Sequence, residues 1–439
     1  MKYYFIGIKG TGMSALATIM HDLGNTVIGY DDYKDHKFTE DPLNERNIKI
    51  YTDDSYKLTD EIVVYSSAFS NNHKEMQKAI AKNLKIYEYT QMVGELTKMN
   101  KTICVSGCHG KTTTTSFLAH VLNNIIGVNY IIGDSTGYAA KENDYLVVES
   151  CEYRRHFLNY DPTITIITNI ELDHTDYYKD LDDMIDAYQS LVNNTKDIVI
   201  LCGDDQNNRK LKVSSHIYYG LNENNDIIAK NITSDLEYTY FDAYVNGKLY
   251  GHIKIKLFGN HMVLNTLAVI ALCDKLNLDK EKVINEISTF KGAKRRFSEK
   301  VVNGTIIIDD YGHHPTELKM SIEACRTKYK DKKICAFFLP NTYSRVAKFY
   351  KEFAESLSLA DKAFILDIAK GRENPDDYKG ISSKLICDLI PNAEMITLED
   401  EKRILPYKDY VLLFMSCQNI YILEERLEKI LKWPKRKKY

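Results

Sequence analysis

The sequence predicts an α/β protein built from three domains, and three observations support this class. Its 439 residues are enough for two or three domains of ordinary size. Short apolar runs typical of strands alternate with helical segments along the chain, which indicates parallel sheets covered by helices. Three of these runs lead directly into loops rich in glycine or histidine, near residues 7, 107 and 311. We expect domains at 1–99, 100–297 and 298–439.

The composition excludes several classes of protein. A formal net charge of −3 argues against a nucleic-acid or membrane-surface protein. No apolar run is long enough to span a bilayer, and the first residues suggest a strand and a glycine loop, not a signal peptide. The nine cysteines are scattered without a C-x-x-C pair, which favours reduced thiols in the cytosol. We therefore expect a soluble cytoplasmic protein without nucleic-acid or membrane partners, either a monomer or a weak homodimer.

The first segment has the pattern of a Rossmann-like domain. The runs YYFIGI, TVIGY and IVVYSSA are expected strands, and helices are expected at Ser14–Leu23 and Lys74–Asn83. The loop GIKGTGMSALA follows the first strand and opens a helix, as a diphosphate-binding loop does. Its glycines are spaced G-x-x-G-x-G, whereas the dinucleotide fingerprint is G-x-G-x-x-G. Asp31 and Asp32 stand where a ribose-binding acid would, so an NAD-dependent enzyme remains an alternative.

The second segment opens on a phosphate-binding loop. The strand KTICVSG leads into GCHGKTTTT, and the helix SFLAHVLNNI follows. The glycines let backbone N–H groups close on phosphate oxygens, Lys111 would neutralise the β- and γ-phosphates, and the Thr112 hydroxyl would hold Mg²⁺. Val105 replaces the first glycine of the full Walker pattern. The spacing predicts a central P-loop domain that binds ATP through Gly107, Cys108, His109, Gly110, Lys111, Thr112 and Thr113.

Polar side chains follow two further strands of this segment. YLVVES carries Glu149, and ITIITNIELDH ends on Asp173 and His174. Because the carboxyl ends of parallel strands meet at one edge of a sheet, we expect Glu149 and His174 to converge on Lys111 and Thr112. Thr112, Glu149 and His174 are the candidate Mg²⁺ ligands. This combination indicates ATP-driven chemistry with an open choice of acceptor, although the lack of an N-K-x-D motif argues against a GTPase.

The remaining elements complete the three segments. FDAYVNGKLYGHIKIKL predicts a β-hairpin because Asn246-Gly247 suits the positive φ angles of a tight turn. Apolar residues at helical spacing predict a helix at Met262–Lys275. From Ser298 onward, the strands expected in GTIIIDDYGHHPTE, KICAFFLP, KAFILDIA and YVLLFM alternate with helices. This pattern predicts a Rossmann-like C-terminal domain.

Together, the motifs resemble those of the Mur ligases. The stretches that carry the resemblance are GIKGTGMSALA, GCHGKTTTT, ESCEYRRHFL, TNIELDHTDYY, GNHMVLNTLAV, FKGAKRRF and DDYGHHPTE. GTGMS and DDYGHHP indicate the alanine-adding branch. The resemblance implies a UDP-sugar-binding, an ATP-binding and an amino-acid-binding domain, in that order. It also implies ATP- and Mg²⁺-dependent joining of L-alanine to the lactyl carboxylate of UDP-N-acetylmuramate through an acyl phosphate, in peptidoglycan precursor synthesis and thus in cell-wall biogenesis and cell division.

The resemblance further implies roles for individual residues. Catalysis would involve Lys111, Glu149, His174 and His313, with His313 a candidate acceptor of the amine proton. Asn265 would contact adenine, Arg296 the phosphates and Asp310 the ribose. The sugar nucleotide and the amino acid would be bound by Gly10, Thr11, Gly12, Met13, Ser14, Tyr311, His314 and Arg345. On the residues alone, Arg296 could be a surface residue, His313-His314 a capped turn and Asn265 an ordinary polar residue of its helix.

Several positions depart from the family pattern. Met262 replaces the first asparagine of G-x-H-N-x-x-N, and Cys151 stands where an aspartate is usual. In the third segment, Asn341 replaces a histidine associated with the amino-acid site, and SCQN at Ser416–Asn419 lacks the two glycines of G-A-G-D. These changes leave open a related ligase for another amino acid or a muramyl peptide. They also leave open a nucleotide-binding paralogue that has lost catalysis.

Overall fold

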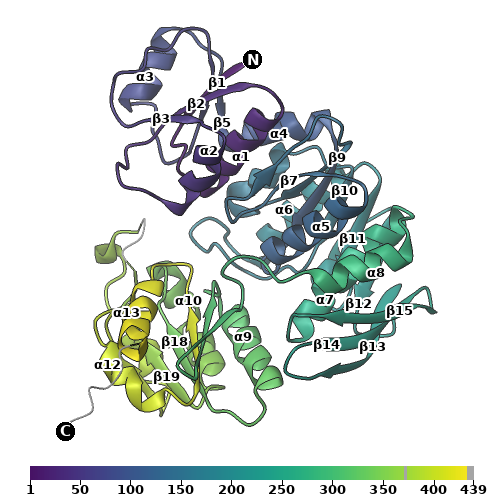
Figure 1. Cartoon of the computed structure of the whole chain (residues 1–439), viewed down its shortest axis with the longest axis vertical. Helices are drawn as coiled ribbons and strands as arrows, with labels where there is room; N and C mark the ends of the chain where they lie inside the picture. The colour runs from purple at the N-terminus through teal and green to yellow at the C-terminus, as the bar shows by residue number, and fades with distance from the viewer. Residues whose placement is uncertain (370–372, 433–439) are drawn as a thin grey trace.

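The computed structural model describes residues 1–369 and 373–432, and it confirms an α/β protein with three domains (Figure 1). Each domain is built on one sheet whose strands are mainly parallel. In the view of Figure 1, the N-terminal domain lies at the top, the central domain at the right and the C-terminal domain at the lower left. Residues 433–439, the end of the expected third domain, lie outside the described residues.

The N-terminal sheet has five parallel strands in the order β3-β2-β1-β4-β5. These strands are β1 (Lys2–Ile6), β2 (Thr26–Tyr30), β3 (Lys49–Tyr51), β4 (Ile62–Tyr65) and β5 (Ile86–Glu88). Its helices are α1 (Thr11–Asp22), α2 (Asp41–Glu45), α3 (Lys74–Ala81) and α4 (Tyr89–Met99), with the short 3₁₀ turn η1 (Phe38–Glu40). The first helix begins three residues before the expected Ser14, because Gly10 has an extended backbone and caps it directly.

The central sheet has ten strands in the order β15-β14-β13-β12-β11-β10-β6-β9-β7-β8. They are β6 (Lys101–Ser106), β7 (Asn129–Ile131), β8 (Gly137–Tyr138), β9 (Tyr145–Glu149), β10 (Ile164–Ile167), β11 (Ile198–Cys202), β12 (His216–Gly220), β13 (Ile227–Ser234), β14 (Thr239–Val245) and β15 (Lys248–Ile255). The helices are α5 (Lys111–Ile125), α6 (Leu181–Asn194), α7 (Asn260–Lys275) and α8 (Lys280–Thr289), with 3₁₀ turns η2 (Tyr153–Asn159) and η3 (Asn208–Lys210). The expected hairpin is confirmed: β14 and β15 are antiparallel, and Asn246 and Gly247 between them have φ of 48° and 74°.

The C-terminal sheet has six strands in the order β16-β17-β21-β18-β19-β20, and only β16 is antiparallel to its neighbour. Its strands are β16 (Ser298–Val302), β17 (Thr305–Asp310), β18 (Ile334–Phe338), β19 (Lys362–Ile365), β20 (Ala393–Met395) and β21 (Val411–Met415). The helices are α9 (Pro315–Lys328), α10 (Tyr343–Leu357), α11 (Lys384–Cys387), α12 (Glu401–Ile404) and α13 (Tyr421–Lys432), with 3₁₀ turns η4 (Pro375–Asp377) and η5 (Leu405–Tyr407). All four strands expected in this segment are present.

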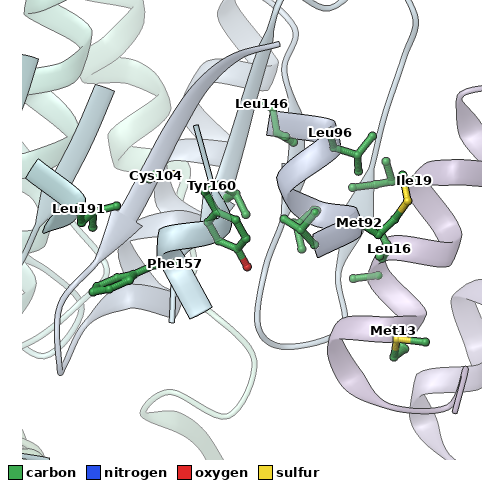
Figure 2. Packing of buried hydrophobic residues seen from close by; sticks show 14 of the residues in the cluster. Met13, Leu16, Ile19, Met92, Leu96, Cys104, Leu146, Phe157, Tyr160 and Leu191 are labelled. Atoms are coloured by element: carbon green, nitrogen blue, oxygen red, sulfur yellow. The ribbon is translucent and has the colours of Figure 1, made fainter. Parts of the chain in front are cut away.

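The N-terminal and central domains share one hydrophobic core. Figure 2 shows side chains of α1 and α4 packed beside those of the central domain. The residues labelled there are Met13, Leu16, Ile19, Met92, Leu96, Cys104, Leu146, Phe157, Tyr160 and Leu191. The cores of the C-terminal domain are separate and, among the described residues, begin only at Phe297. The first two domains therefore form one apolar unit, whereas the third meets the central domain through the polar contacts described below.

Two sequence expectations concern the chain as a whole. All nine cysteines are free thiols, as their dispersed spacing predicts. Within the described ranges 1–369 and 373–432, no helix combines the length and apolar character needed to cross a bilayer.

Candidate functional site

A cavity of about 900 Å³ lies where the three domains meet. The N-terminal domain contributes Thr11 and Phe38, the central domain contributes its phosphate loop and strand ends, and the C-terminal domain contributes the loop after β17 and the start of α13. Ten of the residues expected in the site line this cavity: Thr11, Cys108, Gly110, Lys111, Thr112, Glu149, His174, Arg296, Tyr311 and His313. The convergence of Lys111, Thr112, Glu149 and His174 is therefore confirmed.

The phosphate loop has the geometry that its glycines predict. It joins the end of β6 to α5, and Gly107 and Gly110 have φ of 131° and 83°. Asn169 braces the loop, because its side chain accepts a hydrogen bond from the His109 N–H and donates one to the His109 carbonyl, both at 2.9 Å. The first N–H groups of α5 point into the loop, where a helix N-terminus favours phosphate.

Replacing Gly107 with alanine is expected to disrupt this loop. The new methyl group would lie 2.0 Å from Thr168 Oγ1, at a backbone φ that alanine adopts poorly. The matched control is Gly247→Ala, which also has positive φ (74°) but no atom within 4 Å of the new methyl group. We expect Gly107→Ala to lower nucleotide affinity and the melting temperature, and Gly247→Ala to cost about 1 kcal/mol of stability without affecting nucleotide binding. Equal nucleotide affinity in the two variants, measured by calorimetry, would contradict this account.

Thr112 and Glu149 form a ready set of oxygen ligands beside the loop. The Thr112 hydroxyl donates to Glu149 Oε1 at 2.9 Å, and Glu149 Oε2 accepts a hydrogen bond from the Gly133 N–H at 2.7 Å. Carboxylate and hydroxyl oxygens are the ligands that Mg²⁺ prefers, together with the phosphates of a nucleotide. This donor set fits the expected Mg²⁺–ATP site, and His174 lines the same cavity.

Glu152, which the sequence analysis did not select, is the partner of Lys111. Lys111 Nζ lies 2.8 Å from Glu152 Oε2 and also donates to the Gly107 carbonyl at 2.5 Å. His174 Nε2 lies 3.2 Å from Glu152 Oε1. Burial alone would raise the pKa of Glu152, which is only 1% exposed, but Lys111 and His174 outweigh it and lower that pKa to about 2. A charged carboxylate therefore holds both Lys111 and His174 in place.

Most side chains of the N-terminal loop face the protein interior and not the cavity. Thr11 lines the cavity, whereas Met13 packs into the shared core and the Ser14 hydroxyl donates to the Thr39 carbonyl at 2.6 Å. Gly10 caps α1, and a side chain at Gly12 would lie 2.7 Å from the Tyr89 ring. Any ligand contact of Met13 or Ser14 would thus have to be made by the backbone, and the assignment of these residues to the sugar nucleotide remains a prediction.

The geometry of Asp31, directly after β2, weakens the NAD alternative. The Asp31 carboxylate, in the position of a ribose-binding acid, accepts hydrogen bonds from the Lys9 and Tyr33 N–H groups at 2.9 and 3.0 Å. Asp31 is buried and closes the loop. Asp31 therefore offers no free carboxylate to a ribose, whereas Asp32 is exposed and accepts a hydrogen bond from the Tyr30 hydroxyl at 2.6 Å.

The loop after β17 divides its side chains between the cavity and the protein interior. Tyr311 and His313 line the cavity, and burial lowers the pKa of His313 to about 4. His313 Nδ1 lies 3.1 Å from the Tyr311 carbonyl, an acceptor, so the proton of the neutral ring belongs on Nδ1 and leaves Nε2 as the basic nitrogen. Asp310 is turned inward instead: its carboxylate accepts hydrogen bonds from the Phe297 and Gly312 N–H groups. Its expected contact with ribose stays a prediction.

Asn265 and Arg296 lie where a nucleotide could reach them. Asn265, on α7, places Oδ1 3.0 Å from the point where a β-carbon on Gly110 would lie, so it abuts the phosphate loop. Arg296 lies over the Tyr311 ring, 4.9 Å from its centroid, and 3.7 Å from Glu317. Thr113 is buried in the first turn of α5, and the Cys108 thiol donates to the Glu171 carbonyl at 2.9 Å.

Arg345 is committed to an ion pair between domains. It is 6% exposed, and its Nη2 and Nε lie 2.5 and 3.2 Å from Asp173 Oδ1, while Nη1 donates to Asn341. Burial would raise the pKa of Asp173, but Arg345 more than compensates and holds that pKa well below its usual range. Arg345 is not among the residues that line the cavity, although its partner Asp173 is, so its guanidinium is engaged at the edge of the site and not exposed to it.

Backbone strain is concentrated around the cavity. Among the described residues, six other than glycine and asparagine have left-handed φ angles, and these are Ser135, Arg154, Arg155, His174, Arg295 and Phe297. His174 and Arg295 line the cavity, and the others lie within three residues of a lining residue. Such conformations cost about 1–3 kcal/mol each and are maintained mainly at functional sites.

Three family models match consecutive parts of the chain. The Mur ligase family catalytic domain matches residues 2–101, the Mur ligase middle domain matches 105–273, and the Mur ligase glutamate ligase domain matches 295–411. The chain belongs to the Mur ligase family. Members of this family are ATP-dependent amide ligases, and the three matches follow the order of the three sheets.

Solved structures of Mur ligases share the fold. UDP-N-acetylmuramate–alanine ligase MurC from Thermotoga maritima is 27% identical over 98% of this chain and 99% of its own, with a TM-score of 0.80. A murein peptide ligase from Psychrobacter arcticus is 21% identical over 98% and 99%, with a TM-score of 0.70. MurF from Thermotoga maritima in complex with ADP is 17% identical over 92% and 95%, with a TM-score of 0.65. The last two show a common fold alone.

Three acidic residues of the site were missed from the sequence. Glu152 holds Lys111, while Glu171 and Glu317 both flank His109. Glu152 follows Glu149 by three residues in ESCE, and Glu171 stands inside the NIELDH motif. Glu317 stands three residues after His314, the spacing of a capping box, and this is the signal that could have identified it.

Proposed function

We propose that this Mur ligase joins L-alanine to the lactyl carboxylate of UDP-N-acetylmuramate at the expense of ATP. The observation that carries the proposal is the single cavity lined by the N-terminal loop, the phosphate loop and the loop after β17. A sugar diphosphate at the N-terminal loop, ATP at the phosphate loop and an amine near His313 could therefore meet in one site. The 27% identity to a UDP-N-acetylmuramate–alanine ligase over almost the whole chain supports the choice of substrates.

The residues present suit phosphoryl transfer from ATP to a carboxylate. Mg²⁺ would be held by Thr112, Glu149 and His174, and when bound it would neutralise charge on the transferring phosphoryl group. Lys111, which is paired with Glu152 in this structure, would also interact with the phosphates of the bound nucleotide. A carboxylate is a poor acylating group, and its conversion to an acyl phosphate supplies a leaving group that an amine can displace. Catalysis then depends on positioning and charge more than on a protein nucleophile.

His313 would receive the proton of the attacking amine. Its neutral ring lines the cavity, and Nε2 is the basic nitrogen in the tautomer that the Tyr311 carbonyl selects. Because burial lowers its pKa to about 4, His313 stays neutral at physiological pH and is always available as an acceptor. The low pKa makes His313 a weak base. A weak base is sufficient here, because the amine nitrogen gains positive charge as it attacks the acyl phosphate and its proton becomes much more acidic.

A related ligase for another amino acid or a muramyl peptide is the second candidate. One observation favours it: Arg345, implied in amino-acid binding, is held by Asp173 and by Asn341, which replaces the usual histidine. In this arrangement the amino-acid carboxylate would need another cationic partner. The choice between the two candidates is therefore a question of the acceptor amine.

A phosphate-release assay tests both candidates. The protein would be incubated with ATP, Mg²⁺, UDP-N-acetylmuramate and a panel of amino acids or peptides, with reactions lacking the sugar nucleotide as controls. We expect the fastest release with L-alanine and a rate about 10–200-fold lower with glycine, because one methyl group in an apolar pocket is worth that factor. A different preferred amine would support the second candidate. No release with any acceptor would overturn the ligase function.

A further inference from the structure

A buried polar cluster joins the phosphate loop to the C-terminal domain. It consists of His109 in the phosphate loop, Glu171 after β10 and His314 at the start of α9. Both histidines are 5% exposed, and their rings lie 4.7 Å apart. One ligand atom from each residue lies within 4.8 Å of the others. Two imidazoles and a carboxylate are a common ligand set for zinc, for which three protein ligands leave one position open.

Two distances within this cluster are close to those around a tetrahedral ion. His109 Nε2 lies 3.1 Å from Glu171 Oε2, and His314 Nδ1 lies 3.7 Å from the same oxygen. A zinc ion binds nitrogen and oxygen at about 2.0–2.2 Å, which places adjacent tetrahedral ligands about 3.3–3.6 Å apart. The ligand atoms of the two histidines lie within 4.8 Å of each other. His314 Nδ1 also accepts a hydrogen bond from the Thr316 N–H at 3.4 Å, which a bound ion would replace.

The surrounding groups are those that support a metal site. His109 Nδ1 lies 3.4 Å from Glu317 Oε1, and the Thr316 hydroxyl donates to Glu171 Oε2 at 2.7 Å. A metal-binding histidine usually donates its other N–H to a carboxylate, and a metal-binding carboxylate is usually hydrogen-bonded as well. Both outer partners come from the C-terminal domain, so the site is complete only when this domain is docked.

We propose that His109, Glu171 and His314 form a binding site for a zinc-type divalent cation that links the phosphate loop to the C-terminal domain. This site is separate from the Mg²⁺–ATP ligands Thr112, Glu149 and His174. The bound ion would hold α9 against the nucleotide loop. Zinc-type ions fit better than Mg²⁺, because imidazole is a preferred ligand of the former and oxygen of the latter.

Cobalt(II), a coloured substitute for zinc, tests the proposal on the full-length protein without nucleotide or substrates. We expect one Co²⁺ per chain and visible absorption typical of tetrahedral nitrogen and oxygen coordination. Zn²⁺ should displace the Co²⁺. These readouts do not involve turnover, so they succeed or fail independently of the ligase function.

Matched variants locate the ion. His314→Asn keeps a residue able to cap α9 but removes the imidazole, and Glu171→Gln removes the charge; each should weaken binding at least about tenfold. Glu317→Gln should weaken it about 10–100-fold through His109. His216→Asn, at an exposed histidine, is the control and should bind as the parent protein does.

Three results would overturn the proposal. The first is no stoichiometric binding to the parent protein. The second is unchanged affinity in both His314→Asn and Glu171→Gln, each shown to be folded by its thermal transition. The third is a thiolate-to-cobalt absorption band that disappears in Cys151→Ser. That band would place the ion instead at the Cys151, Glu152 and His174 cluster, whose ligand atoms also lie within 4.8 Å of one another.

Discussion

Replacing Lys111 with methionine is expected to lower turnover at least about 10²–10³-fold while the protein still folds. The side chain belongs to the phosphate loop itself and lines the cavity, where its ammonium group would contact the phosphates that the loop binds. Phosphoryl transfer depends on that charge more than on covalent chemistry. Phosphate release and nucleotide affinity, measured on the same preparation, separate a catalytic loss from a binding loss.

A double variant controls for the buried partner. Lys111→Met leaves Glu152 buried beside His174 without its lysine partner, and breaking a buried pair costs up to about 3–5 kcal/mol. Adding Glu152→Gln removes the stranded charge, so Lys111→Met/Glu152→Gln should regain much of the stability but none of the activity. A double variant with near-parent activity would show that Lys111 does not act on the phosphates.

Replacing Arg345 with methionine is expected to detach the C-terminal domain from the central domain. Asp173 would then remain as an unpaired buried charge, at a cost of about 3–5 kcal/mol that falls mainly on the contact between domains. The cores of the C-terminal domain do not include Arg345, so this domain should stay folded. Small-angle scattering should report a larger radius of gyration, and turnover should fall because the cavity loses its third wall.

Asp173→Asn combined with Arg345→Met distinguishes the effect of an unpaired buried charge from the effect of losing the arginine side chain. The double variant no longer carries a buried unpaired carboxylate and should recover part of the docking that Arg345→Met loses. If Arg345→Met scatters like the parent protein and keeps its activity, the ion pair does not hold the domains together.

The pH dependence of this contact follows from the shifted carboxyl. The pKa of Asp173 is well below its usual range in the folded chain, against about 3.9 when unfolded. The pair therefore contributes its full stabilisation above the unfolded value and loses it progressively as the pH falls toward the folded value. We expect compact scattering from about pH 5 to 8 and domain separation in acid.

Much of the fold was predictable because it depends on local patterns. Strands such as TVIGY and YVLLFM match β2 and β21 to the residue or nearly so, and the Asn246-Gly247 turn forms as expected. The phosphate loop was predictable for the same reason, since Gly107 and Gly110 are required by backbone angles that other residues rarely adopt. Helix starts were less accurate, because α5 begins at Lys111 inside the loop motif, five residues before the expected SFLAHVLNNI.

The partners of the site residues could not be predicted in this way. Glu152 faces Lys111 across 41 positions of sequence, and Arg345 meets Asp173 across 172. Neither pairing leaves a periodic or compositional signal, because each depends on how separate elements pack. The same holds for Ser14 and Asp310, whose polar groups were expected at a ligand but are hydrogen-bonded within the chain.

The sequence by itself determined the α/β class, the three-domain order, the phosphate loop and the convergence of Glu149 and His174 on it. These follow from side-chain periodicity, from glycine at special backbone angles and from the common edge of parallel strands. Only the tertiary structure decided which charges neutralise Lys111, Asp173 and His109, and that the first two domains share a core while the third docks through polar contacts. The free energy of a charged side chain depends on its burial and on partners from distant parts of the chain. Neither can be inferred from the residues that adjoin it in the sequence.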